Sequence, residues 1–495
     1  MSARVLAAVA AALLTGCASL DAPFSGHLES PGTAVRACAE WYARLDAEVG
    51  DARVRDAQDA RVAGFPYLRA SRLLAALRPL AQADVQALHA LADRMLARDL
   101  EARRFEIMNL PGGRLPGITD AFERTQQCGK LLREIDMAKP EARSALLERA
   151  QVPDDYSTLS RALGLYALTR FAFASGVRRQ EAETREAFAR EPATPPGAAL
   201  VRYAPQPAKP LARTRAAAIL ERSALNPLGI PEPGESELAE LLAAHAPSFE
   251  VAVRADYDRP GALRWVRDEA TPGVDATDLA VYAHPAWTRY RGRVLLQLVY
   301  TLWFPERPPQ SEGDIFAGKL DGLVWRVTLA PDGEPLVFDS MHACGCYHQF
   351  FPTPRARPLP APDDTEEWMF SPQALPRFAP SERPLLRVAS GTHAIERVGI
   401  VRGTDSLARY ELRPYAELRS LQRFGPGRAS AFGEDGLVAG SERAERFLFW
   451  PMGIASAGAM RQWGRHATAF VGRRHFDDAD LLEKRFSFEL DAGAP

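Results

Sequence analysis

The sequence predicts an α+β protein, in which an N-terminal helical domain is followed by a domain of mainly antiparallel β-sheet. Three observations indicate this order. Apolar residues recur at helical spacing up to about residue 190, and six prolines gather between residues 191 and 210. Beyond residue 247 the chain is rich in valine, leucine and aromatic runs. Seven of the eight tryptophans lie beyond residue 250, where we expect them to pack the sheet.

The region 31–190 forms the predicted helical domain, and its first helix has the clearest pattern. Apolar side chains there recur every three or four residues and make one stripe, formed by Val35, Cys38, Tyr42, Leu45 and Val49. Further helices are predicted at about 67–81, 84–103, 118–136, 140–150 and 156–190. Asp84 and Thr119 are the residue types that cap helix N-termini, so we expect them to begin two of these helices.

Residues 191–211 are predicted to be a proline-rich, extended linker, because proline disfavours both helices and sheet interiors. The remainder, 212–495, is predicted to be a β-rich α+β domain that opens with short helices at about 212–224 and 235–246. Pro331-Asp332-Gly333 separates two strand-like runs and predicts a hairpin turn. The apolar stretch 447–460 contains proline and glycine and is too short to span a bilayer, which favours buried core.

The N-terminal residues have the pattern expected of an export signal. A single basic residue, Arg4, precedes an apolar run from Val5 to Leu14, and Leu14-Thr15-Gly16-Cys17 follows. This tetrad resembles the lipobox of bacterial lipoproteins. The resemblance implies that residues 1–16 are a cleaved signal peptide and that Cys17 is the acylated first residue of the mature chain.

The same resemblance predicts where the protein resides. Ala18 stands where the family's inner-membrane retention signal has aspartate, which implies the outer membrane and its periplasmic face. Residues 17–30 would then form a lipidated tether, with the lipid bilayer as a partner through acylated Cys17. The 61 basic and 63 acidic residues nearly balance, so nothing favours a nucleic-acid partner.

In an oxidising periplasm the four cysteines other than Cys17 can pair in three ways. The arrangement we favour joins Cys38 to Cys128 and Cys344 to Cys346. Cys38 lies on the apolar face of its helix, and Cys128 shares a helical face with neighbouring apolar residues, so two packed helices could bring them together. Gly345 permits the sharp bend that a bond between Cys344 and Cys346 needs.

The segment His342-Ala343-Cys344-Gly345-Cys346-Tyr347-His348 is the strongest candidate for chemistry. Three interpretations remain open for it: structural thiols or a disulfide, a labile redox pair, and a zinc or copper site with His342, Cys344, Cys346 and His348 as ligands. All four could ligate one ion only if the chain folds back at Gly345. A distant histidine could also complete a smaller site; the candidates are His393, His466 and His475.

Established catalytic motifs are absent from the sequence, so whether the protein is an enzyme stays open, and we lean towards a non-enzyme. His393 and Glu396 have a spacing compatible with two metal ligands or an acid–base pair. The aromatic, glycine and cysteine texture of residues 321–352 resembles the signature of a family of proteobacterial lipoproteins, which implies no particular activity. We therefore expect a binding or structural envelope protein, with an envelope protein as a possible partner; the alternative is a metal-binding or thiol-redox protein.

Overall fold

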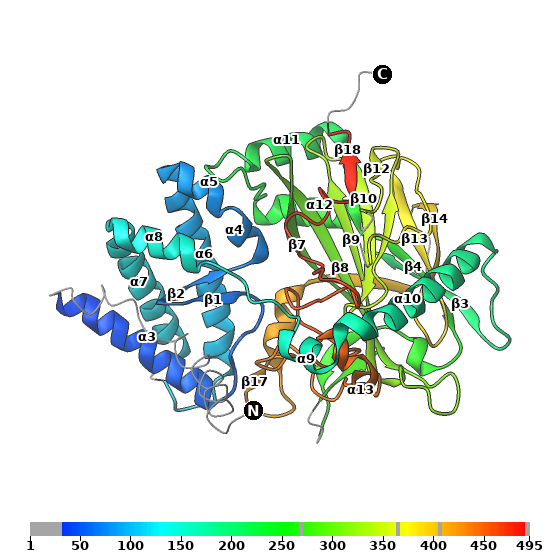
Figure 1. Cartoon of the computed structure of the whole chain (residues 1–495), viewed down its shortest axis with the longest axis horizontal. Coiled ribbons are helices and arrows are strands. Elements are labelled where there is room, and N and C mark those ends of the chain that lie inside the picture. Colours follow the sequence, from blue (N-terminus) through cyan, green and yellow to red (C-terminus); the bar gives the residue numbers. More distant parts are fainter. Residues whose placement is uncertain (1–31, 116, 268–270, 363–366, 404–407, 491–495) are drawn as a thin grey trace. The chain divides into compact units, whose positions relative to one another are not determined.

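The computed structural model describes residues 32–115, 117–267, 271–362, 367–403 and 408–490. The predicted signal peptide, lipobox and most of the tether lie outside these ranges. The chain divides into two compact units, Met1–Pro153 and Asp154–Pro495 (Figure 1). Helices dominate the first unit and a large, mostly antiparallel sheet the second, which confirms the predicted α+β class.

The first unit is built around three long helices. On α3 the predicted apolar stripe is confirmed, because all five of its residues are buried together with Trp41. Asp84 caps α6 as predicted, and its side chain accepts hydrogen bonds from the amides of Gln86 and Ala87. Thr119 is not the predicted cap, since α7 begins directly after Gly117. The helices of this unit are α3 (Thr33–Asp51), α4 (Arg72–Ala76), α5 (Arg78–Ala83), α6 (Val85–Asn109), α7 (Ile118–Met137) and α8 (Pro140–Arg149).

The predicted helix at 67–81 is wrong in its first turn, which instead belongs to a β-hairpin. Strands β1 (Ala60–Val62) and β2 (Phe65–Ala70) pair antiparallel around Gly64, whose φ is +83°. Ion pairs hold β2 to α6, because the buried side chain of Arg69 reaches Asp99 at 3.1 Å and Glu106 at 2.6 Å. Partners supplied by a distant helix cannot be predicted from the periodicity of residues 67–81.

The second unit contains a ten-stranded sheet within the described residues, in the order β11-β10-β9-β8-β7-β15-β3-β4-β13-β14. Neighbouring strands are antiparallel except where β4 meets β13 and where β15 meets β3 and β7. The hairpin predicted around Pro331 is confirmed between β9 and β10. The strands of the sheet are β3 (Ala199–Pro205), β4 (Ser248–Val253), β7 (Ala280–Tyr290), β8 (Arg293–Arg307), β9 (Gly318–Leu329), β10 (Pro335–His342), β11 (Gln349–Pro352), β13 (Glu382–Val388), β14 (Ile395–Arg402) and β15 (Ala408–Pro414).

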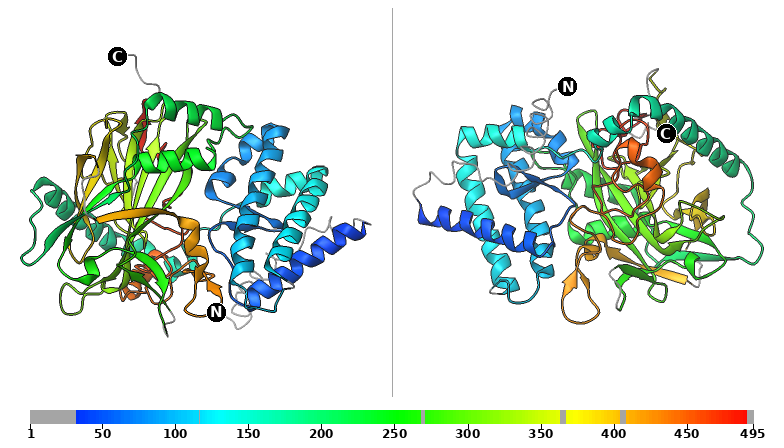
Figure 2. Two further views of the ribbon diagram at one scale, coloured as in Figure 1. Left: turned by 180° about the vertical axis from the view of Figure 1, so that it is seen from behind. Right: turned by 60° about the horizontal axis from the view of Figure 1, so that its bottom comes forward.

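Both faces of this sheet are buried, because successive side chains of β8 point alternately into one core and the other. Leu298 and Tyr300 pack into a core with α11 (Arg213–Ser223) and α12 (Glu235–His245), which agree with the two predicted short helices. Val299 and Trp303 enter a second core on the opposite face, with side chains from the last eighty residues of the chain. Figure 2 shows the two helices beside each other against the sheet.

The remaining elements of this unit are short. The two-stranded sheets join β5 (Ala262–Trp265) to β6 (Pro272–Asp275), β12 (Ala356–Pro358) to β18 (Phe486–Phe488), and β16 (Leu421–Gln422) to β17 (Arg428–Ala429). The short helical segments are η1 (Asp256–Asp258), η2 (Tyr415–Arg419), α13 (Arg446–Phe449) and η3 (Trp450–Met452). Across the described residues, no helix is both long and apolar enough to cross a membrane.

The division between the units differs from the predicted linker. The units separate after Pro153, so α9 (Thr158–Leu163) and α10 (Tyr166–Ala189) belong to the sheet-containing unit, where α10 contacts β14 and η3. Within the predicted linker 191–211 lies β3, an internal strand of the large sheet. The side chain of Tyr203 on β3 is buried in the sheet's core, and this burial favours a strand over an extended connector.

Candidate functional site

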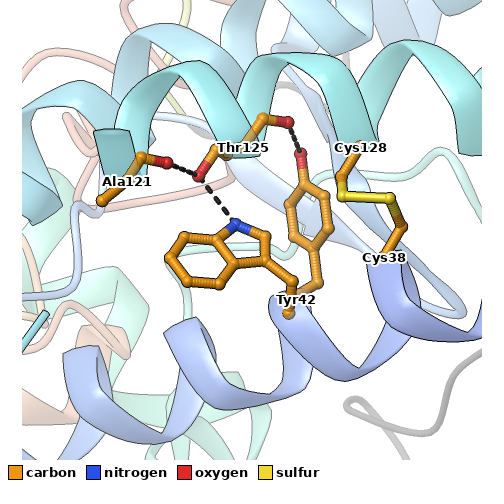
Figure 3. The surroundings of a disulfide bond; sticks show 6 residues. Cys38, Tyr42, Ala121, Thr125 and Cys128 are labelled. Carbon is orange, nitrogen blue, oxygen red and sulfur yellow. Dashed lines mark hydrogen bonds between the residues drawn. A yellow bond between two sulfur atoms is a disulfide. The ribbon is translucent and has the colours of Figure 1, made fainter. Parts of the chain in front are cut away.

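A disulfide joins Cys38 to Cys128 in the first unit, as the sequence favours. The sulfurs of Cys38 on α3 and Cys128 on α7 are 2.07 Å apart (Figure 3). One turn along each helix, Thr125 accepts a hydrogen bond from the indole nitrogen of Trp41, and its carbonyl oxygen accepts one from the hydroxyl of Tyr42. The bond therefore reinforces a helix contact that is also packed and hydrogen-bonded.

In the second unit, the predicted chemical segment forms a tight turn at the end of β10. The amide of His342 donates to the carbonyl of Cys346, and the amide of Gly345 donates to the carbonyl of His342. Gly345 has φ +92°, and a Cβ there would lie 2.5 Å from the carbonyl oxygen of Ala467. Only glycine fits this turn without displacing the loop that covers it.

Cys344 and Cys346 are free thiols in the structure, in contrast to the predicted second disulfide. The amide of Cys346 donates to Sγ of Cys344 over 3.4 Å, an arrangement that a bond in so small a ring would have to change. Hydrogen bonding from Cys346, supported by Arg443, lowers the pKa of Cys344, and the same contact raises the pKa of Cys346. Cys344 is thus the sulfur that holds a negative charge more readily.

The two histidines of the segment turn away from each other. Nδ1 of His342 lies 3.3 Å from Asp321, whereas Nε2 of His348 lies 2.9 Å from Asp339, which also pairs with Arg326. Asp321 and Arg326 are an odd number of residues apart on the regular strand β9 and so point to opposite faces of the sheet. The structure therefore does not bring the four predicted ligands to one point, and among the described residues no group of three or more His, Cys, Asp or Glu side chains has a metal-binding arrangement.

His393, a candidate for a distant ligand, lies in a buried chain of charges. Its Nδ1 is 2.9 Å from Asp321, its Nε2 is 3.4 Å from Asp258, and its ring stacks on Phe304 at 3.9 Å. Although burial disfavours its charged form, the hydrogen bonds that its ring donates to Asp258 and Asp321 raise the pKa of His393 above its usual value. The predicted partner Glu396 instead pairs with Arg387 at 3.6 Å, so the two do not form an acid–base pair.

The other two candidate histidines lie apart from this chain. Nε2 of His466 lies 3.2 Å from the carbonyl oxygen of Ala343, so His466 contacts the turn through its backbone. The ring of His475 lies 3.4 Å from Asp154 and 3.5 Å from Asp155. Neither approaches the thiols as a ligand in the structure.

Beside the turn lies a cavity of about 470 Å³, bounded by α10, the turn and the C-terminal loops. Its lining is predominantly apolar, and Cys346, Tyr347 and His348 bring the predicted segment to its wall. Glu445 also lines it, and burial raises the pKa of this carboxyl to about 7. Its apolar lining includes Phe173, Val177, Phe316, Leu448, Phe449 and Phe470.

A second cavity of about 300 Å³ adjoins the first, since Gln180, Thr184, Tyr347 and Gln349 line both. This cavity is more polar. Ser340, His342, Thr392 and the guanidinium-bearing Arg307 contribute to its wall. Together the two cavities form one site under α10 that changes from apolar to polar along its length.

The spacing of cysteines and histidines in the sequence indicates the candidate segment but not most of the residues around it. Asp321 and Arg307 lie in strands, and Arg443 and Glu445 lie in a loop, at positions without a spacing signal. The unusual burial of acidic and basic side chains identifies them, and this is known only once the sheet is assembled. Comparisons of the chain with protein-family models, curated proteins and solved structures find no match.

Proposed function

We propose that this protein is an outer-membrane-anchored, periplasm-facing lipoprotein that binds a small molecule in the cavity beneath α10. The observation that carries the proposal is the cavity itself, whose volume of about 470 Å³ lies in the range of small-molecule sites. Its mixture of aromatic walls and a few polar groups is the composition typical of such sites. Binding requires no catalytic group, in agreement with the absence of catalytic motifs from the sequence.

The proposed location rests on the lipobox and is supported by the Cys38–Cys128 bond, since disulfides persist in oxidising compartments. Intact-mass analysis of protein from a Gram-negative host tests it. We expect a chain that begins at Cys17 and carries diacylglycerol and a further acyl group. A Cys17→Ser chain serves as the control and should lack the adduct. An unmodified, uncleaved wild-type chain would contradict the proposed anchor.

The binding proposal is tested with Gly176→Phe, because Gly176 lines the cavity on α10 and its Cβ position has no atom within 4 Å. A phenylalanine there should occupy the cavity without a backbone clash. We expect small molecules extracted from purified wild type to be depleted in this variant. Ser175→Phe is the matched control on the neighbouring, exposed position. Equal extracts from wild type and both variants would contradict the proposal.

A second candidate function, thiol–disulfide exchange, is favoured by the contact between Cys344 and Cys346 at the cavity wall. The two thiols would be oxidised to a disulfide while a disulfide substrate is reduced to two thiols, which balances electrons and protons. Incubation with glutathione disulfide should remove two free thiols from wild type and leave Cys344→Ser with at most a mixed disulfide. Zinc or copper at this segment remains a prediction, and elemental analysis of the same protein tests it.

A further inference from the structure

We infer that the ligand is an amphiphilic anion, such as a medium-chain carboxylate, whose charged group lies beside Arg307 in the second cavity and whose apolar chain occupies the first. This inference rests on the proposed function and names its ligand class. It follows from a buried cation without a carboxylate partner, from the polar groups around it and from the apolar cavity next to it.

Arg307 is the unusual residue of the second cavity. It is 8% exposed, and its Nε is buried without a hydrogen-bond partner. Its guanidinium lies over the rings of Phe316 and Tyr347, at 5.6 and 5.9 Å from their centroids. Within the described ranges no carboxylate lies within ion-pair distance of it. Although burial disfavours its charge, Tyr347, to which it is hydrogen-bonded, and the more distant carboxylate of Asp321 raise the pKa of Arg307. Buried cations are normally paired, because an unpaired charge in a protein interior is costly, so this position favours an anionic ligand.

Asp321 and Glu396 are already engaged with other partners. Asp321 accepts from His342, His393 and Arg443, with Arg443 at 3.2 Å. Glu396, on the cavity wall, lies 3.6 Å from Arg387. Glu445 faces the first cavity and is about half protonated at neutral pH, given its pKa of about 7. Arg307 therefore shares the charge of Asp321 with His342, His393 and Arg443, and no carboxylate of the described residues forms an ion pair with it alone.

The polar groups next to Arg307 suit a carboxylate. Ser340 and Thr392 offer hydroxyl donors on the wall of the second cavity. Gln349 lines both cavities, is buried, and has an amide oxygen without a hydrogen-bond partner. Its amide can be oriented to donate to an anion once a ligand is bound. An oxyanion at this junction would accept charge-assisted hydrogen bonds from these groups.

The first cavity supplies the complementary apolar surface. The first cavity meets the second at Tyr347 and Gln349. From there it extends between α10 and two segments of the chain that contain Phe449 and Phe470. Each methylene of an unbranched apolar chain that leaves water lowers the free energy of binding. One end of the site therefore suits a charged group and the other end suits a hydrocarbon chain. A ligand that has both is an amphiphile.

The test compares decanoate, decanol and decylamine as probes, by calorimetric titration of the full chain carrying Cys17→Ser, so that no detergent is needed for an acyl anchor. We expect decanoate to bind at least about 10-fold more tightly than decanol, as one charge-assisted contact allows. Decylamine should bind most weakly. Arg307→Gln should remove the preference for decanoate, whereas Arg402→Gln, at an exposed arginine, should keep it.

The outcomes separate this inference from the proposed function. Equal binding of decanoate and decanol, both lost in Gly176→Phe, would overturn the anionic ligand and leave the cavity as a binding site. Tighter binding of decylamine would also overturn it and point to Glu181 and Glu445, the carboxyl groups that line the first cavity. If no probe binds, the inference fails, and the extraction experiment decides separately on the proposed function. Should Arg307→Gln not fold, the comparison of the three probes on the otherwise unchanged chain still decides.

Discussion

At the scale of single residues, Gly345 determines the geometry of the candidate site. It combines a left-handed backbone with a carbonyl oxygen 2.5 Å from where its Cβ would be. This turn places Cys346 and Tyr347 on the cavity wall. Glycine thus positions the side chains on both sides of it, because only a residue without a Cβ fits this turn.

We predict that Gly345→Ala destabilises the second unit by about 3 kcal/mol or more, because it adds a steric clash to the backbone penalty. Gly292→Ala is the matched control: its φ is +78°, but nothing lies within 4 Å of its Cβ position, so it should lose only about 1 kcal/mol. Urea unfolding followed by tryptophan fluorescence measures both. Equal losses in the two variants would show that the turn is not held by the loop around Ala467.

The sequence identified this turn from the spacing of its cysteines and histidines, but it could not predict their partners. Alternation along a strand follows from the backbone, yet which carboxylate faces His342 or His348 depends on the register of β9 and β10. Arg307 gave no signal, since arginine is common in this chain. Its significance comes from burial without an ion pair, which only the assembled structure provides.

At the scale of elements, the contact between α3 and α7 combines packing, hydrogen bonds and a covalent bond. Thr125 links two side chains of α3 to α7, and its hydroxyl also donates to the carbonyl of Ala121 (Figure 3). The disulfide closes a loop over a sequence separation of 90. Most of its effect should therefore act on the unfolded chain, whose freedom it restricts.

We predict that replacing both Cys38 and Cys128 by serine lowers the free energy of unfolding of the first unit by about 4 kcal/mol. Limited proteolysis with fragment mass analysis distinguishes the units: cleavage should accelerate before Pro153 and remain unchanged after it. Cys344→Ser is the control, because its thiol is not bonded. Faster cleavage in the second unit alone would contradict this assignment.

Elements with strong local signals were predicted, and elements stabilised by distant partners were not. The stripe of α3 and the cap of α6 are local, and both agree with the structure. β2 is held by an arginine that pairs with α6, and β3 lies between β4 and β15, strands that are far from it in sequence. Proline content alone therefore suggested a linker where the structure has an internal strand.

At the scale of the whole molecule, the fold class was predictable because helical and strand periods occupy different parts of the chain. The limits of the two units were not, since α10 has the period of a helix but packs with the sheet-containing unit. Periodicity predicts that a helix or strand forms, but it does not predict which part of the molecule that element packs against. Each unit buries its own set of apolar side chains, so each can be expected to have its own response to pH.

The second unit should lose stability as pH falls below about 6.5. Burial lowers the pKa of His348 and of His466 to about 3, so both stay neutral in the folded state, whereas an unfolded histidine binds a proton near pH 6.5. Between these values the unfolded chain holds more protons, and stability therefore decreases with decreasing pH. At pH 5 this amounts to about 2 kcal/mol for each histidine.

His393 acts in the opposite direction, because its raised pKa adds stability below about pH 6.5 that is lost as pH rises through its folded value. Replacing one histidine isolates the contribution of His466 from those of the other buried histidines. We expect His466→Gln to lower stability at pH 7 through lost packing, but to reduce the further decrease between pH 7 and pH 5 by about 2 kcal/mol. Denaturant unfolding at both pH values measures the difference, and an unchanged decrease in the variant would mean that His466 is not neutral in the folded protein.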